Sequence, residues 1–265
     1  MTERTGNVIC SLSGRQVRYR FSGSFFLWLF LLLKVYASAK MELVLKVSVG
    51  DRVMTKKQRA SIIIDLLRQE YPDATCSLDY DEAWKLLVSV RLAAQCTDAR
   101  VNIVVEDLYA AYPTVEALAN ASVEEIERIV KPCGLGKSKA KDISACMKIL
   151  HDKYDGKVPE DFDALLALPG VGRKSANLIV GDVFGKPAIV TDTHCIRLVN
   201  RFGLVDGIKD PKKVEMALWK IIPPEDGNDF CHRLVYHGRA VCTARTKPDC
   251  ENCCLKEVCK RVGVK

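Results

Sequence analysis

A lysine placed just after a glycine turn is the first group in the sequence that could do chemistry. Gly170, Val171 and Gly172 predict a tight turn between a short helix that ends at Leu168 and a second helix, whose first turn contains Lys174. Cations are disfavoured at a helix N-terminus by roughly 0.3–1 kcal/mol, so a lysine there suggests a role beyond solvation. A neutral amine is the nucleophile of Schiff-base chemistry. The alternative is an exposed lysine that contacts phosphate or solvent.

The same turn is suited to bind a phosphate group without any side-chain charge. Glycine adopts backbone angles that other residues avoid, and it lets a second backbone approach closely. The following helix begins with unpaired N–H groups and the positive end of its dipole, which together favour an anion. Such contacts position a DNA duplex but read no sequence. The alternative is a plain corner between two helices.

The segment V-T-D-T-H contains a carboxylate and an imidazole. Asp192 stands directly before a helical pattern that starts at Cys195, which is the usual place of an N-cap residue. A catalytic role requires Asp192 to face Lys174, and sequence spacing does not show this. We expect His194 to play a supporting role.

The last part of the chain concentrates cysteines. Five of the twelve lie between Cys242 and Cys259, and the spacing Cys242-x7-Cys250-x2-Cys253-x5-Cys259 gathers four thiols, with Cys254 as an extra one. Four cysteines in one loop indicate an iron–sulfur cluster, a zinc site or two disulfides. Zinc usually uses two closely spaced cysteine pairs and only one is present, so we favour a 4Fe-4S cluster, and then zinc. The other cysteines are scattered singly, which indicates a reducing compartment.

Composition and charge limit the class of protein. The chain has 265 residues, of which 48% are hydrophobic and 28% charged, and this excludes a disordered chain, a collagen-like fibre and a polytopic membrane protein. The net charge is +7, but residues 1–40 carry six basic residues against one acidic residue, so the net charge alone does not argue for DNA binding. A local basic cluster surrounds the cysteines: Arg233, Arg239, Arg245, Lys247, Lys256, Lys260 and Arg261.

The start of the chain resembles a secretory signal. Residues 25–33 are apolar, follow several arginines and precede Ala37-Ser38-Ala39, a pattern of basic, apolar and small residues. The apolar run is too short for a membrane span. Either the protein is exported, or its real start is Met41 or Met54. We favour the second, interpret residues 15–39 as a spurious signal, and expect a cytoplasmic protein of bacterial type associated with the nucleoid.

From residue 54 onward the pattern is helical nearly throughout. Ser122 and Glu125 form a capping box ahead of an apolar stripe, and Asp210 and Pro211 occupy the N-cap and first position of another helix. No regular series of alternating strands is present. We therefore predict an all-α fold of about ten short helices.

These features in this order resemble one family, endonuclease III, the helix-hairpin-helix DNA glycosylases with an iron–sulfur loop. The likeness runs from about Met54 to Lys260. It rests on four motifs: A-A-Q-C-T-D at 93–98, L-P-G-V-G-R-K-S-A at 168–176, V-T-D-T-H at 190–194 and H-G-R-A-V-C at 237–242.

The resemblance implies two helical domains with a DNA cleft between them. A six-helix barrel with the helix-hairpin-helix motif would span 76–186. Residues 54–75 and 187–265 would form the iron–sulfur cluster domain, and residues 1–53 would be a non-domain N-terminal extension.

The resemblance also implies a bifunctional DNA glycosylase and AP lyase of base excision repair that excises oxidised pyrimidines. Lys174 would attack C1′ of a nucleotide flipped from the duplex, which is necessary because C1′ is inaccessible in the stack. Asp192 would activate Lys174 or stabilise positive charge on the sugar. The Schiff base then allows β-elimination 3′ to the abasic site.

Further expectations concern the partners. The implied substrate is double-stranded DNA containing damaged pyrimidines or abasic sites, bound by a monomer with no membrane contact in its mature form.

Gln95 and Leu135 match the positions that fill and wedge the vacated stack, although Leu135 could instead be a buried loop anchor. The glycine turn and His194 would contact DNA. The cluster ligands would be Cys242, Cys250, Cys253 and Cys259.

The sequence departs from the family pattern at two places, and three other functions are alternatives to the bifunctional glycosylase. The first cysteine loop has seven residues where the family usually has six, which leaves open whether Cys254 can serve as a ligand, and Ala93 replaces a frequent serine. A monofunctional glycosylase of the adenine type typically lacks a lysine at the position of Lys174. A non-catalytic DNA-binding module predicts that Lys174 is dispensable. A secreted disulfide-bonded protein predicts no iron.

Overall fold

The computed structural model describes residues 7–12, 15–20 and 54–264, and the chain divides into two compact units, Met1–Met54 and Thr55–Lys265. In the first unit, strand β1 (Asn7–Leu12) pairs antiparallel with strand β2 (Arg15–Arg20), with Asn7 opposite Arg20. Part of the basic segment of the signal-like pattern is therefore a strand. The apolar run that follows it lies outside the described residues.

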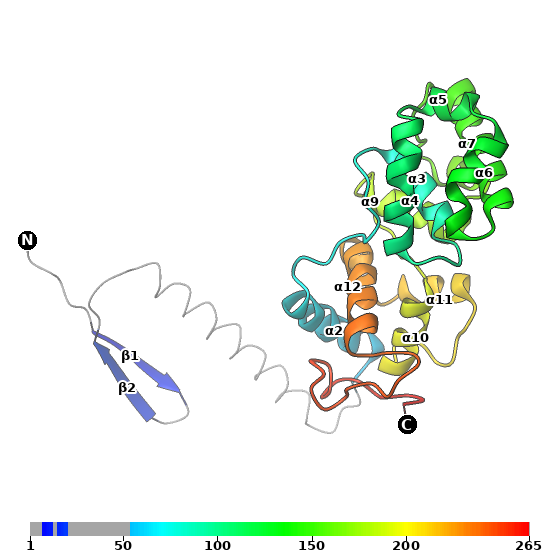
Figure 1. Cartoon of the computed structure of the whole chain (residues 1–265). Helices are drawn as coiled ribbons and strands as arrows, with labels where there is room; N and C mark the ends of the chain where they lie inside the picture. The colour runs from blue at the N-terminus through cyan, green and yellow to red at the C-terminus, as the bar shows by residue number, and fades with distance from the viewer. Residues whose placement is uncertain (1–6, 13–14, 21–53, 265) are drawn as a thin grey trace, which may run out of the picture. The chain divides into compact units, whose positions relative to one another are not determined.

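The second unit is helical, as predicted (Figure 1). Its α-helices are α2 (Lys56–Glu70), α3 (Ala83–Leu92), α4 (Asp98–Ala111), α5 (Val115–Asn120), α6 (Val123–Val130), α7 (Gly136–Tyr154), α8 (Phe162–Leu166), α9 (Arg173–Asp182), α10 (Thr193–Phe202), α11 (Pro211–Leu218) and α12 (Gly227–Ala240). Two short 3-10 helices, η1 (Lys131–Cys133) and η2 (Pro224–Asp226), complete it. No helix in the described part of the chain is long and apolar enough to cross a membrane.

Local sequence explains where most of these helices begin. Seven start after a residue whose side chain accepts a hydrogen bond from a backbone N–H of the first turn, which is N-capping: Thr55, Thr97, Thr114, Ser122, Asp161, Asp192 and Asp210. The predicted capping box of Ser122 and Glu125 is confirmed. By contrast, α7 begins after Leu135 and α9 after Gly172, and neither residue makes a side-chain cap bond. These two helices therefore keep first-turn N–H groups available for an outside partner.

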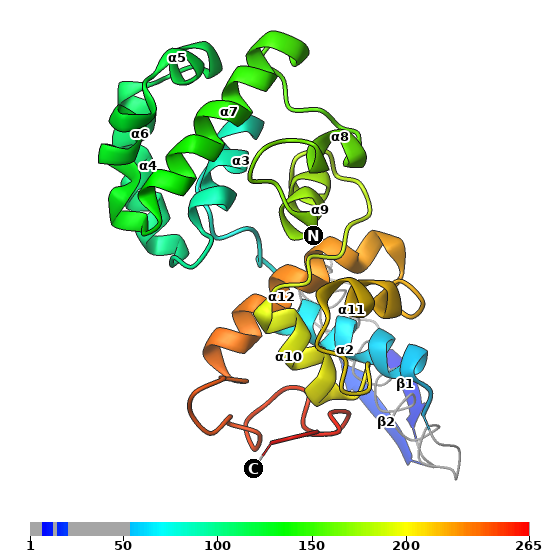
Figure 2. The same cartoon turned by 90° about the vertical axis from the view of Figure 1, so that its right-hand side faces the viewer.

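The helices pack in two groups within this unit. Both views show α3 to α9 gathered on one side and α2, α10, α11 and α12 on the other (Figures 1 and 2). The long helix α7 packs against α5 and α6, while α12 packs against α2, α9 and α10. Arg233 Nε donates to the Tyr71 carbonyl at 3.2 Å, so this hydrogen bond joins α12 to the C-terminal end of α2. The division into domains at residues 75 and 186 stays a prediction.

Candidate active site and metal centre

The glycine turn before α9 depends on one close approach. Gly170 has φ +77°, and a Cβ there would lie 2.8 Å from Arg91 Cδ and 2.9 Å from Asp142 Cβ. Arg91 Nε donates to Asp142 Oδ2 at 2.7 Å. The glycine turn therefore packs against an ion pair that joins α3 to α7. Helix α8 ends at Leu166, two residues before the predicted end, because Pro169 has no N–H with which to continue it.

Lys174 is the second residue of α9 and its side chain is exposed. The neighbouring Arg173 donates two hydrogen bonds, at 2.6 and 2.7 Å, to the buried carboxylate of Glu215. Of these two adjacent cations, one therefore binds α9 to α11, while Lys174 forms no ion pair in the described part of the chain. The predicted place of Lys174 in the first turn of this helix is confirmed, its exposure agrees with the alternative of an exposed lysine, and its catalytic role stays a prediction.

The charge of Lys174 acts on Asp98, a residue that the sequence reasoning did not assign to the site. Asp98 accepts hydrogen bonds from Ser77 Oγ and from Arg239 Nη2, each at 2.6 Å. Burial raises the pKa of Asp98, but these bonds and the positive charges of Arg239 and Lys174 outweigh it and lower the pKa below its ordinary value. Asp98 thus joins the start of α4, the segment before α3 and the end of α12 beside Lys174. Its place at the end of the A-A-Q-C-T-D motif was the available signal.

Asp192 is the N-cap of α10. Its Oδ1 accepts a hydrogen bond from the Cys195 N–H at 2.7 Å, and the side chain is half-buried. No ion pair within 4.0 Å joins Asp192 to Lys174 among the described residues. The structural interpretation of Asp192 is therefore established, and its catalytic role stays a prediction.

His194 lies where α10 meets α12. A Cβ on Gly238 would lie only 2.5 Å from His194 Nδ1, so the glycine of the H-G-R motif permits this close contact. His194 Nδ1 also lies 3.2 Å from Arg197 Nη2. Burial lowers the pKa of His194 and outweighs the nearby charge of Asp192, which raises it. The imidazole is therefore neutral near pH 7.

Gln95 and Leu135 share an unusual backbone conformation. Their φ angles are +58° and +52°, in the left-handed region that side chains other than glycine rarely adopt. Gln95 is exposed and Leu135 is 55% exposed, so the alternative of a buried loop anchor is wrong for Leu135. The fully buried Lys139 donates to the carbonyls of Leu92 and Cys133, each at 2.8 Å. This one ammonium group joins the two loops that carry Gln95 and Leu135.

The four predicted cluster ligands, Cys242, Cys250, Cys253 and Cys259, line one cavity near the end of the chain. N–H groups donate to three of their sulfurs: Arg201 Nη1 to Cys242 at 3.2 Å, Leu255 N to Cys253 at 3.4 Å and Arg261 N to Cys259 at 3.3 Å. Such hydrogen bonds are a feature of thiolates that hold iron–sulfur clusters. The eleven cysteines from Cys76 to Cys259 are all free, which is contrary to the alternative of disulfides in the final loop.

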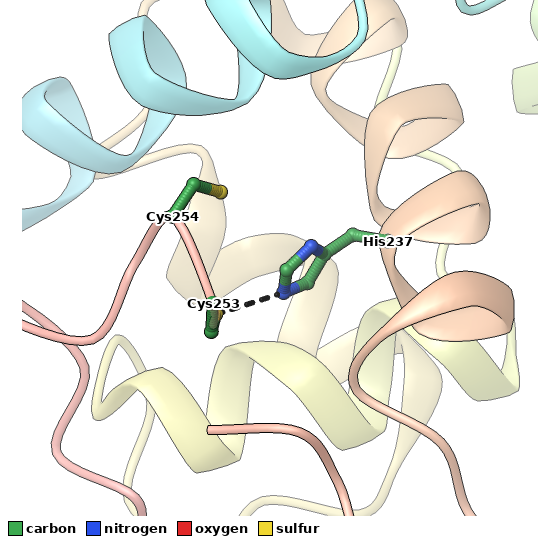
Figure 3. Close-up of side chains that lie close together, drawn as sticks. All are labelled: His237, Cys253 and Cys254. Carbon is green, nitrogen blue, oxygen red and sulfur yellow. Dashed lines mark hydrogen bonds between the residues drawn. The ribbon is translucent and has the colours of Figure 1, made fainter. Parts of the chain in front are cut away.

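His237, which the sequence reasoning did not single out as a ligand, reaches this loop from α12 (Figure 3). The ligand atoms of His237, Cys253 and Cys254 lie within 4.8 Å of one another and could hold a metal ion. A hydrogen bond from the Cys254 thiol, aided by His237 Nε2 and opposed by burial, lowers the pKa of Cys253 to about 4. Cys253 is therefore a thiolate, the form that binds metals. Tyr71 Oη lies 3.1 Å from His237 Nδ1 and orients the ring.

Comparisons with known proteins agree with this arrangement. Residues 88–224 match the family model of the HhH-GPD superfamily of base excision DNA repair proteins. Endonuclease III of Synechocystis sp. is 47% identical over 210 residues, which cover 78% of this chain and 94% of that protein. A non-covalent endonuclease III–DNA complex and a trapped endonuclease III–DNA covalent intermediate each match with a TM-score of 0.74 and 40% identity, covering 79% of this chain and 97% of theirs.

Proposed function

Because the chain belongs to the endonuclease III family of base excision DNA repair proteins, we propose that it is a bifunctional DNA glycosylase and AP lyase that removes damaged pyrimidines from double-stranded DNA. The observation that carries the proposal is the exposed Lys174 in the first turn after the glycine turn, which forms no ion pair with any residue that the structure describes. The trapped covalent endonuclease III–DNA intermediate among the structural matches supports a covalent mechanism.

In the proposed complex, backbone N–H groups rather than side chains bind the DNA phosphates. The free first-turn N–H groups of α7 and α9, after Leu135 and Gly172, are donors for phosphate oxygens, and the helix dipoles favour the negative charge. We assign Gly170, Val171 and Gly172 to one phosphate contact, with His194 as a neutral neighbour. Phosphate binding of this kind releases counterions, so affinity should fall steeply with salt.

Gln95 and Leu135 are assigned to the space that a flipped nucleotide leaves. Both side chains project from left-handed turns that are exposed, and Lys139 holds the two loops together from the interior. A rigid wedge loses little conformational freedom when it enters the stack. The apolar Leu135 would unstack the bases, and the amide of Gln95 would hydrogen-bond the base left unpaired.

The proposed chemistry begins at Lys174 Nζ. The neutral amine attacks C1′, the N-glycosidic bond breaks, and the base leaves with the electron pair and takes up a proton. Ring opening then produces an imine between Nζ and C1′. Loss of a proton from C2′ then breaks the C3′–O bond, and the downstream strand leaves with its phosphate as a 5′-phosphate. Water hydrolyses the imine, which frees the lysine and leaves an unsaturated aldehyde on the upstream strand. The carboxylate of Asp192 would stabilise positive charge on the sugar or assist deprotonation of the amine.

We further propose that Cys242, Cys250, Cys253 and Cys259 hold a 4Fe-4S cluster. Their shared cavity and the N–H donors to their sulfurs fit a group that needs several thiolates. The cluster would fasten the final loop to α10 and α12, because metal binding organises a segment that has little core of its own. A zinc site that uses His237, Cys253 and Cys254 is the competing assignment.

The proposal also covers the domain boundaries, the oligomeric state and the cellular location of the protein. Residues 76–186 would form the barrel domain, residues 54–75 with 187–265 would form the cluster domain, and the enzyme would act as a monomer. Its free thiols suit a reducing compartment, so we place its action on DNA in the cytoplasm.

Borohydride trapping tests the central claim. The protein is mixed with a duplex that contains one thymine glycol, and borohydride is added to reduce any imine to a stable amine. We expect a covalent protein–DNA adduct with the wild type and none with Lys174→Gln. Lys212→Gln is the matched control, because Lys212 is also an exposed lysine at the second position of a helix.

Each other outcome has a defined meaning. An adduct that persists in Lys174→Gln would assign the nucleophile to another residue. Free base released without an adduct would identify a monofunctional glycosylase. Tight duplex binding with neither base release nor an adduct would reduce the protein to a DNA-binding module.

A further inference from the structure

Two cysteines outside the final loop lie side by side on the two loops that carry Gln95 and Leu135. Cys96 directly follows Gln95, and Cys133 precedes Leu135 by two residues. Helix α4, which begins two residues after Cys96, packs against η1, which ends at Cys133. The side chains of Cys96 and Cys133 hydrogen-bond to each other, and both are free thiols. Their sulfurs are therefore within reach of each other although the two residues are distant in the chain.

The two thiols differ in their access to solvent. Cys133 is 2% exposed and belongs to the hydrophobic core, whereas Cys96 is half-buried and packs against that core. Oxidation of cysteine depends on exposure, and redox-sensing cysteines often have a second, resolving cysteine beside them. Cys96 is therefore the thiol that a small oxidant reaches first, and Cys133 is placed to react with the product.

A buried ammonium group lies beside this pair. Lys139 Nζ donates to the carbonyls of Leu92 and Cys133, each at 2.8 Å. Burial lowers the pKa of Lys139, and the negative charges of Cys133 and Cys96 oppose that shift, so the ammonium group and the two thiols share one space. A nearby cation favours the thiolate, which is the reactive form of cysteine.

Cys133 is protected until its neighbour has reacted. The pKa of the Cys133 thiol is raised to about 11, mainly by burial and further by the charge and the hydrogen bond of Cys96, while the charges of Lys139 and Arg100 oppose the shift. Near neutral pH this thiol keeps its proton. Oxidation of Cys96 to a neutral sulfenic acid removes the contribution of its charge, so Cys133 loses its proton more readily once an electrophilic sulfur lies beside it.

We propose that Cys96 and Cys133 form an oxidative modification site, at which a peroxide converts the two thiols to a reversible disulfide that draws the loops of Gln95 and Leu135 together and slows base excision. A disulfide holds two sulfurs much closer than a hydrogen bond between thiols does. A displacement of about 1 Å in positioning groups costs on the order of 10²-fold in rate. The effect on excision rests on the proposed function, whereas formation of the disulfide does not.

The oxidation takes place in two balanced steps. Cys96 Sγ loses its proton and attacks one peroxide oxygen, the O–O bond breaks, and the leaving hydroxide takes up that proton as water. The product is a sulfenic acid. Cys133 Sγ then loses its proton and attacks Cys96 Sγ, the S–S bond forms, the S–O bond breaks, and a second water leaves. The two thiols together lose two electrons, and one molecule of hydrogen peroxide is reduced to two of water.

Mass spectrometry of tryptic peptides tests the modification site. Trypsin releases Cys96 within residues 92–100 and Cys133 within residues 129–137, because the bond between Lys131 and Pro132 is not cut, and each peptide contains one cysteine. The full chain is purified anaerobically and treated with hydrogen peroxide, and its remaining thiols are alkylated before digestion. We expect these two peptides to be linked, and the link to disappear after treatment with a thiol reductant.

Three variants identify the pair. Cys96→Ser should lose the linked peptides, and Cys133→Ser should leave Cys96 as a sulfenic acid that dimedone labels. Cys76→Ser is the matched control, because Cys76 is also half-buried but hydrogen-bonds to the carboxylate of Asp182 instead of a thiol. It should form the linked peptides to the same extent as the wild type. Thermal unfolding of each variant shows whether it is folded.

Excision of thymine glycol from a duplex measures the consequence. The oxidised wild type should excise about tenfold more slowly than the reduced wild type, and the thiol reductant should restore the rate. Cys96→Ser should excise at the rate of the reduced wild type both before and after peroxide treatment. Visible absorption of both proteins shows whether peroxide has damaged an iron–sulfur cluster.

The possible failures are distinguishable. Absence of the linked peptides in excess peroxide, whether Cys96 stays a thiol or passes to sulfinic acid, would overturn the modification site. Linked peptides with an unchanged excision rate, or equal slowing of the wild type and Cys96→Ser, would overturn the control of excision. If the reduced wild type neither excises thymine glycol nor forms a borohydride adduct, the proposed function fails, and the peptide measurement still decides whether the disulfide forms.

Discussion

Arg239 Nη2 donates to the carboxylate of Asp98 at 2.6 Å and so joins the last turn of α12 to the first turn of α4. The two residues are 141 positions apart in the chain. Ser77 shares the same carboxylate, and Lys174 contributes positive charge nearby. This contact therefore sets the spacing between the two helix groups at the place where the proposed nucleophile lies.

The Asp98 contact should give stability a defined pH dependence. The folded state lowers the pKa of Asp98, so the stabilisation is complete above the unfolded value of about 3.9 and is lost as pH falls through the folded value. We expect Asp98→Asn to lower the free energy of unfolding by about 1–2 kcal/mol at pH 7, and the difference from the wild type to shrink below pH 4. Urea unfolding between pH 3 and pH 7 measures this, and a difference that stays constant would contradict it.

The two glycines of the turn should respond differently to alanine. Gly170→Ala places a side chain at φ +77° and against the Arg91–Asp142 pair, and it should cost at least about 1–2 kcal/mol of unfolding free energy. Gly172 has φ −95° and nothing within 4 Å of an added Cβ. Gly172→Ala should therefore keep its stability, and any loss would appear in DNA affinity. Chemical denaturation and duplex titration separate the two effects, and equal destabilisation would contradict the geometry.

Leu135 should matter for damaged DNA and not for folding. Its side chain is 55% exposed, so Leu135→Ala should change the free energy of unfolding by less than about 0.5 kcal/mol. We expect it to slow excision of thymine glycol about tenfold, because the vacated stack loses its apolar filler. Ile103→Ala is the control, since Ile103 is another exposed apolar residue, 61% exposed and on α4. Equal excision rates for both variants would reject the wedge.

Neighbouring cysteines should differ in their effect on iron. Cys253 lines the cavity shared by Cys242, Cys250 and Cys259, and Cys254 does not. Cys253→Ser should therefore lose the visible absorption and most of the iron of anaerobically purified protein, whereas Cys254→Ser should retain both. Iron analysis with absorption spectroscopy decides this. Loss of metal from Cys254→Ser, with zinc instead of iron in the wild type, would favour the site formed with His237.

The features that sequence reasoning predicted correctly are those written within a few residues. Ser122 and Glu125 close a capping box inside one turn, and the glycine turn places Lys174 at the start of α9. The four cysteines line one cavity, which follows from their short spacing. Each depends on backbone geometry over fewer than about twenty residues, and composition and local pattern specify that directly.

Other features required the folded chain because their partners are distant in sequence. Lys139 is a plain helical lysine in the sequence, yet it is fully buried between the carbonyls of Leu92 and Cys133. Asp98 with Arg239, and Asp182 with His232, are 141 and 50 residues apart. Tertiary packing determines which polar groups share a buried space, and a buried polar group takes whatever partner lies within hydrogen-bond reach. The sequence alone thus determined the helices, the place of Lys174 at the start of α9 and the cysteine loop, while only the tertiary structure decided that this lysine is exposed and which charges lie near it.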